Sequence, residues 1–140
     1  MVAALTTWLG WTFVMHSALN FIASGIVIVW GVAHIVPTAA VVRSFGEISP
    51  DSRRIITMEW VAEGLALAFI GLLVLTVTLA AEPADPVATL VFRCCAVALI
   101  TLAIWTLVAG FRTAVLPIKI CPLVLSTAAG LLVVATLTGA

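Results

Sequence analysis

Residues 87–111 read VATLVFRCCAVALITLAIWTLVAGF, a run of twenty-five residues that contains a single charge, Arg93. About twenty consecutive apolar residues are enough to cross the hydrocarbon core of a bilayer as a helix. In lipid only helices and closed barrels satisfy every backbone polar group, and an apolar run of this length without alternation favours the helix. The run therefore predicts one membrane-spanning helix.

Three further apolar runs, at about 7–36, 55–81 and 118–138, have the same character. The connectors between the runs carry the residues that end helices, namely Pro37, Gly46, Pro50, Pro83, Pro86 and Pro117. We therefore predict an all-α integral membrane protein, a four-helix antiparallel bundle. It forms one domain over residues 1–140, with helices at about 8–36, 55–81, 87–112 and 118–138. Ser49 and Asp85 each precede a proline and are expected to cap the helices that follow them.

Composition excludes a soluble protein and points to the lipid bilayer as the main partner. The chain is 64% hydrophobic and 9% charged with a mean hydropathy of +1.34, whereas soluble domains are about half apolar and a quarter charged. Its formal net charge is zero and its few basic residues are scattered, so a nucleic-acid partner is excluded. The sequence is compatible with a homo-oligomer or with a place in a larger membrane complex.

The basic residues predict the orientation of the bundle. The first and third connectors hold five of the six basic residues, which are Arg43, Arg53, Arg54, Arg112 and Lys119. The other side has only Arg93. Because cytoplasmic loops are enriched in Lys and Arg, we expect a multi-pass protein of the cell membrane with both termini outside the cytoplasm.

Glu59 and Glu63 are the strongest indication of chemistry in the chain. They lie four residues apart in the second predicted helix, so they share a face one turn apart. Neighbouring carboxylates in a low-dielectric site repel each other, so at least one should hold a proton or find a cation, as a general acid requires. The alternative is structural: Glu59 reaches the membrane boundary and Glu63 bonds a neighbouring helix.

Polar residues of the first helix form a stripe that should face the bundle interior. His16, Asn20 and His34 fall on about the same face of a helix, with Ser24 at its margin. His34 has the membrane depth of the glutamate pair and is a candidate catalytic partner. His16 and Asn20 are candidate ligand contacts, although hydrogen bonding between helices would explain them equally well.

Trp60, Trp105 and Arg112 are the remaining candidates for ligand binding. Trp105 and Arg112 are seven residues apart and share a face, and Lys119 follows just beyond Pro117. Arg112 could pair with a glutamate or hold an anionic head group from the inner leaflet. The alternative roles are ordinary ones, with the cations as anchors that set topology and the tryptophans as belt or packing residues.

No metal or cofactor is expected. The two histidines lie on one helix about five turns apart, so they cannot share a single iron, although a divalent metal between His34, Glu59 and Glu63 is conceivable. Cys94 and Cys95 are adjacent on one helix, which does not suit disulfide geometry.

Several short motifs resemble the small four-helix membrane proteins of the DoxX-like group. They are residues 61–67 (VAEGLAL), residues 70–74 (IGLLV), residues 31–34 (GVAH) with Pro37 after them, and Phe45-Gly46. The resemblance implies a four-helix antiparallel bundle and, since that group includes a subunit linked to quinone reduction, an accessory role in a quinone-linked redox complex. A vaguer similarity to sterol isomerases rests on acids inside a bundle and transfers no residue.

Three functions follow from these features. The first is binding of a lipophilic small molecule, with acid-base chemistry such as isomerisation, cyclisation or epoxide opening by Glu63, Glu59 and His34. The second is an accessory subunit of a membrane complex, in which the acids face a partner protein. The third is a small proton-coupled transporter, which the lack of an internal repeat makes the weakest of the three.

Overall fold

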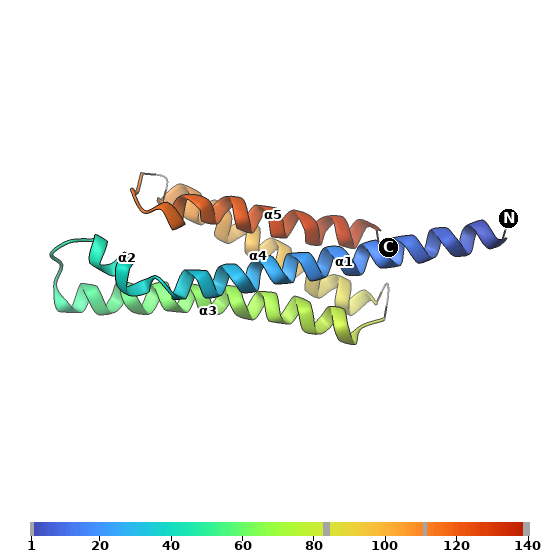
Figure 1. The fold of residues 1–140 in the computed structure, drawn as a ribbon, viewed down its shortest axis with the longest axis horizontal. Helices are drawn as coiled ribbons and strands as arrows, with labels where there is room; N and C mark the ends of the chain where they lie inside the picture. Colours follow the sequence, from blue (N-terminus) through green and yellow to red (C-terminus); the bar gives the residue numbers. More distant parts are fainter. Residues whose placement is uncertain (1, 83–84, 111, 139–140) are drawn as a thin grey trace.

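A computed structural model describes residues 2–82, 85–110 and 112–138 of the chain, with side chains from Met15 onward. In these ranges every regular element is a helix: α1 (Val2–Ile35), α2 (Thr38–Ser44), α3 (Pro50–Ala80), α4 (Pro86–Gly110) and α5 (Leu116–Thr138). Four of them, α1, α3, α4 and α5, are long and apolar enough to cross a membrane. Successive long helices run in opposite directions (Figure 1), which confirms the four-helix antiparallel bundle.

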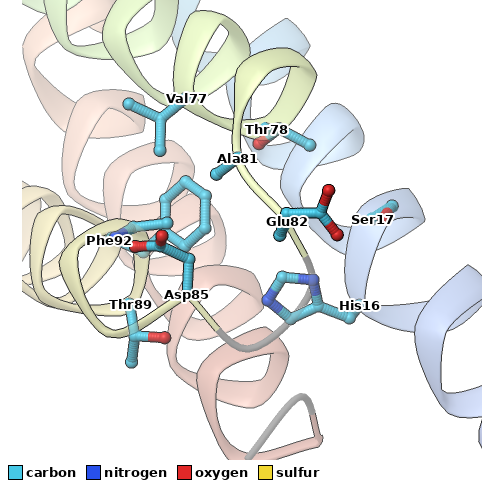
Figure 2. A pocket seen from close by; sticks show the side chains of 10 residues that line it. His16, Ser17, Val77, Thr78, Ala81, Glu82, Asp85, Thr89 and Phe92 are labelled. Carbon is cyan, nitrogen blue, oxygen red and sulfur yellow. Dashed lines mark hydrogen bonds between the residues drawn. The ribbon is translucent and has the colours of Figure 1, made fainter.

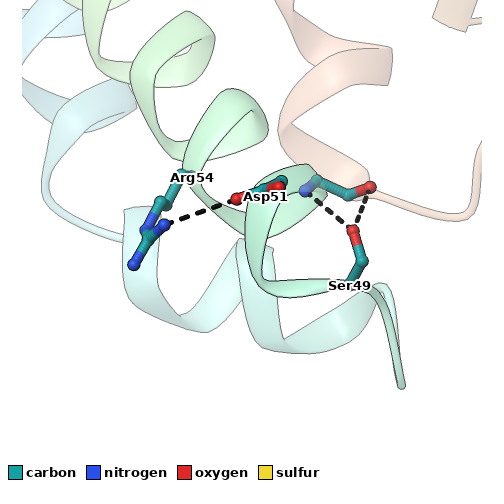
Figure 3. A network of polar contacts seen from close by, with 4 residues as sticks. Ser49, Asp51 and Arg54 are labelled. Carbon is teal, nitrogen blue, oxygen red and sulfur yellow. Dashed lines mark hydrogen bonds and ion pairs between the residues drawn. The ribbon is translucent and has the colours of Figure 1, made fainter.

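The start of α3 shows why an apolar run marks a membrane crossing and not a whole helix. The run begins at Ile55, but α3 begins at Pro50 because the side chain of Ser49 accepts a hydrogen bond from the backbone N–H of Ser52 at 3.1 Å. Asp51 then contacts Arg54 at 3.4 Å on the exposed first turns (Figure 3). These polar turns carry α3 beyond its apolar run.

The predicted cap of the next helix is also present. The Asp85 carboxylate accepts hydrogen bonds from the backbone N–H groups of Val87 and Ala88, both at 2.8 Å. Because the first N–H groups of a helix have no partner within it, this acceptor fixes the start of α4 where the chain turns back into the bundle.

The helix α1 is longer than one crossing requires. Its 34 residues span about 51 Å at 1.5 Å per residue, against a hydrocarbon core of about 30 Å. Figure 1 shows its N-terminal turns extending past the end of α5 and past the α3–α4 connection.

Backbone contact through glycine joins α1 to α3. A Cβ atom added to Gly31 would lie 2.7 Å from the backbone N of Ala68 and 2.7 Å from the carbonyl O of Gly64. One added to Gly71 would lie 2.9 Å from the carbonyl O of Ser24. The hydrophobic effect does not drive association between helices in lipid. Small residues at such crossings instead allow the close packing that holds the helices together. The pairing of α1 with α3 therefore depends on the absence of side chains at these positions.

The bundle is closed on three sides more tightly than on the fourth. The helix α1 packs against both α3 and α5, and α5 packs against α4, whereas α3 and α4 meet at few residues. Figure 1 shows α4 starting near the end of α3 and then crossing toward α5. Since α3 and α4 separate away from their connection, the bundle is least closed between them at the end where α1 stops.

Candidate functional site

A proline determines where α1 ends and leaves carbonyl groups without partners there. Pro37 has no N–H to donate and disfavours a helical conformation at Val36, and α1 ends at Ile35. The last carbonyl groups of a helix receive no hydrogen bond from an N–H group of the same helix. In an apolar medium each of them needs another donor. His34 carries one of these carbonyls.

Trp60 of α3 provides the missing donor. Its indole Nε1 donates a hydrogen bond to the backbone carbonyl of His34 at 2.6 Å, and Trp60 is only 8% exposed. The two rings also stack, with centroids 4.1 Å apart and planes inclined by 12°. Trp60 was expected to line a ligand pocket, and in the structure it holds both the backbone and the imidazole of His34 in place.

The third member of the group is Glu63. Its Oε2 lies 3.4 Å from Nε2 of His34, with the His34 side chain 2% exposed and the Glu63 side chain 33% exposed. Charge-assisted hydrogen bonds are typically about 2.7–2.9 Å long, and Nε2 has no hydrogen bond of good geometry among the described residues. The pair is thus close but loose, a condition common in catalytic pairs without substrate.

Trp30 and Cys121 extend this group, and the sequence did not single them out as site residues. The buried Trp30 Nε1 has no hydrogen bond of good geometry among the described atoms, and the buried Cys121 thiol of α5 lies beside Trp30. Trp30 precedes His34 by one helical turn, so the spacing of the polar stripe could have included it. Cys121 could not be found this way because its helix carries no polar stripe. We refer to Trp30, His34, Trp60, Glu63 and Cys121 as the His34 cluster.

The polar stripe of α1 faces the interior, as predicted. Asn20 is 0% exposed and Ser24 is 2% exposed. Ser24 donates its hydroxyl proton to the carbonyl of Phe21 in its own helix at 2.9 Å, whereas neither polar atom of the Asn20 side chain has a partner among the described residues. Asn20 lies more than three turns from His34 along α1, so it does not belong to the His34 cluster.

His16 lies at the opposite end of the bundle from His34. It lines a small cavity of about 50 Å³ together with residues of α3, α4 and their connection, among them Glu82, Asp85 and Phe92 (Figure 2). Its ring is tilted against Phe92, with centroids 6.0 Å apart. His16 and His34 therefore lie at opposite ends of the molecule and do not belong to one site.

The other candidates lie on the outside. Glu59 is exposed and forms no ion pair within the described part of the chain. Trp105 is 68% exposed, and Arg112 is exposed just beyond the end of α4. Of the eight predicted site residues, the structure brings together His34, Trp60 and Glu63. Nowhere in the described ranges do three His, Cys, Asp or Glu side chains lie close enough to share a metal ion.

Replacing Trp60 by phenylalanine should lower stability because the carbonyl of His34 would lose its donor. A buried acceptor left without a partner costs about 1–3 kcal/mol, and phenylalanine keeps a ring to stack on the imidazole. Thermal unfolding of the purified protein in detergent would measure the loss. The matched control is Trp105→Phe, which changes the same atoms on the exposed face of α4, and equal unfolding midpoints for the two variants would exclude this role for Trp60.

Comparisons of the chain with protein-family models, curated proteins and solved structures found no match.

Proposed function

We propose that the His34 cluster binds a lipophilic small molecule and performs acid-base chemistry on it. The observation that carries the proposal is the contact between Nε2 of His34 and Oε2 of Glu63, 3.4 Å apart in an apolar bundle. Ionisable groups inside a membrane are costly, and they are functional candidates by default. The stack and the hydrogen bond from Trp60 hold the imidazole in place, as a preorganised catalytic group requires.

Access from the lipid is supported by the loose edge of the bundle. One third of the Glu63 side chain is exposed, and α3 makes few contacts with α4. A ligand that partitions into the bilayer would reach Glu63 laterally between these helices, without passing through water. The nearby indole and thiol of Trp30 and Cys121 would provide a largely apolar wall.

An acid and a base side by side suit reactions that neither add nor remove atoms. Isomerisation of a double bond or cyclisation needs one proton given at one carbon, by the carboxyl, and one taken at another, by the imidazole. The pair returns to its starting state when the imidazolium passes its proton to the carboxylate. Opening of an epoxide is different because it adds water. The carboxyl protonates the epoxide oxygen as its C–O bond breaks, water bonds to the carbon, and the proton that this water loses passes through the imidazole back to the carboxylate. Positioned proton transfer of this kind contributes about 10²–10⁴-fold to a rate.

The experiment that tests the proposal is mass spectrometry of organic extracts from the purified protein. Wild type should retain a specific lipophilic compound that the Glu63→Gln variant loses. Glu59→Gln is the matched control, because it makes the same change one turn away at an exposed position. Recovery of only bulk phospholipid from all three proteins would contradict a ligand site in the His34 cluster.

The exposure of Glu59 favours a second candidate function. An exposed carboxylate without an ion pair in the described part of the chain, placed within the apolar run of α3, suits a contact with a cation of another membrane protein. The chain would then be an accessory subunit, as the DoxX-like resemblance also implies. Co-purification of a stoichiometric partner from native membranes, lost in Glu59→Gln and kept in Glu63→Gln, would favour this function.

We also propose that both termini lie outside the cytoplasm, on the distribution of basic residues. The connector that contains α2, the connector from α4 to α5, and the first turns of α3 and α5 lie at one end of the bundle (Figure 1). Together they carry five of the six basic residues. Alkaline phosphatase, which is active only after export, should be active when fused to the C-terminus and inactive when fused in the α2–α3 connector. The reverse pattern would invert the proposed orientation.

A further inference from the structure

A cavity between α4 and α5 lies at the end of the bundle where most basic residues gather. It has a volume of about 310 Å³ and is lined by Thr106, Leu107, Gly110, Ile118, Lys119 and Pro122. An open depression lined by Leu107 and Arg112, among others, adjoins it. Leu107 belongs to both, so together they form one continuous surface that is lined by two cations and by apolar side chains. We call it the α4–α5 groove.

The charges of the α4–α5 groove are all of one sign. Every described residue that lines it is either uncharged or basic, and neither Arg112 nor Lys119 forms an ion pair with a described residue. The positive end of α5, which begins at Leu116, adds to the same field. The groove therefore complements an anion that also carries an apolar part.

A proline inside α5 adds a polar acceptor at the same place. Pro122 lies within the helix and has no N–H, so the carbonyl of Ile118 loses its usual partner four residues on. Ile118 and Pro122 both line the cavity. A carbonyl without its helical donor at the membrane boundary can accept a hydrogen bond from a head-group hydroxyl.

We propose that the α4–α5 groove binds an anionic glycerophospholipid. Its phosphate would lie between Arg112 and Lys119, and one acyl chain would run along Leu107 and Ile118 into the bilayer. Basic pockets between membrane helices are suited to such head groups. A zwitterionic lipid carries an ammonium group that the two cations would repel, so the groove distinguishes lipids by charge.

The test measures binding of phosphatidylglycerol and phosphatidylcholine to the delipidated full-length protein in detergent by native mass spectrometry. Wild type should bind phosphatidylglycerol in preference to phosphatidylcholine. The Arg112→Gln, Lys119→Gln double variant should bind phosphatidylglycerol about twenty-five-fold more weakly, since each cation near an anionic head group contributes a factor of about five.

The control is the Arg43→Gln, Arg53→Gln double variant, which removes the same charge at the same end of the bundle outside the groove. It should bind phosphatidylglycerol as wild type does, and an equal loss in both variants would mean diffuse attraction to charge and overturn the site. Equal binding of the two lipids by wild type would also overturn it. Glycerol phosphate, which has the anion without acyl chains, should not displace the lipid, and full displacement would indicate a site for a soluble phosphate instead.

Discussion

A leucine at Gly31 should destabilise the protein far more than a leucine at Gly25 on the same helix. Position 31 faces the backbone of α3, where an added Cβ would lie 2.7 Å from two backbone atoms. A side chain at a crossing can turn aside, but a backbone can yield only if the whole helix moves. Overpacking typically costs about 1–3 kcal/mol, and the loss at Gly31 should reach or exceed the top of this range.

Gly25 is the matched control because a Cβ atom added there would have no other atom within 4 Å. Leucine is apolar and a better helix former than glycine, so Gly25→Leu should unfold at or above the wild-type temperature. Thermal unfolding in detergent, followed by loss of the monodisperse species in gel filtration, would measure both variants. Equal midpoints would show that the close approach of α1 and α3 does not hold the bundle together.

The four crossings could be predicted from the sequence because lipid leaves a chain few alternatives. Each crossing helix must satisfy its own backbone hydrogen bonds, and only long apolar runs can do so without exposing charge. The ends of the helices depend on capping side chains and not on hydropathy. Hydropathy placed the start of the second long helix at Ile55, whereas the cap by Ser49 starts α3 at Pro50. The short helix α2 lies within a connector, and its four consecutive apolar residues, Ala39 to Val42, are too few to indicate a helix.

The rotation of each helix was harder to predict than its existence. In a soluble bundle the apolar stripe shows which face is buried, but a helix in lipid is apolar all round and gives no such indication. Trp105 and Arg112 share a face by spacing, yet Trp105 points outward and is 68% exposed. The polar stripe of α1 was the exception, because Asn20 and His34 could not face lipid at low cost.

The contact between His34 and Glu63 could be anticipated from membrane depth, but the role of Trp60 could not. Depth follows from counting residues along two helices. The hydrogen bond from Trp60 to the carbonyl of His34 depends in addition on how α1 and α3 are rotated about their axes. That rotation is fixed by glycine contacts such as Gly31 against Gly64, which join residues far apart in the sequence.

Replacing Glu63 by glutamine should abolish most of the chemistry proposed for the His34 cluster while the protein still folds. Glutamine has nearly the same shape, and its neutral amide can bond to the imidazole of His34, whose Nε2 lies 3.4 Å from the Glu63 carboxyl. It cannot give or take a proton. Once the retained compound is identified, its conversion by Glu63→Gln should be slower by about 10²–10⁴-fold, measured as single-turnover product formation in detergent micelles.

Two controls separate this effect from a change in structure. Glu59→Gln should react at a rate within about three-fold of wild type, because a surface substitution away from the reacting groups rarely alters stability by more than about 0.5 kcal/mol. Glu63→Asp keeps the acid but shortens its reach toward His34, so it should restore part of the rate lost in Glu63→Gln. If both Glu63 variants instead turn over at the wild-type rate, the carboxyl has no part in proton transfer. If both Glu63 variants react more slowly and also unfold at a lower temperature than wild type, Glu63 stabilises the packing of α1 on α3 and takes no part in the reaction.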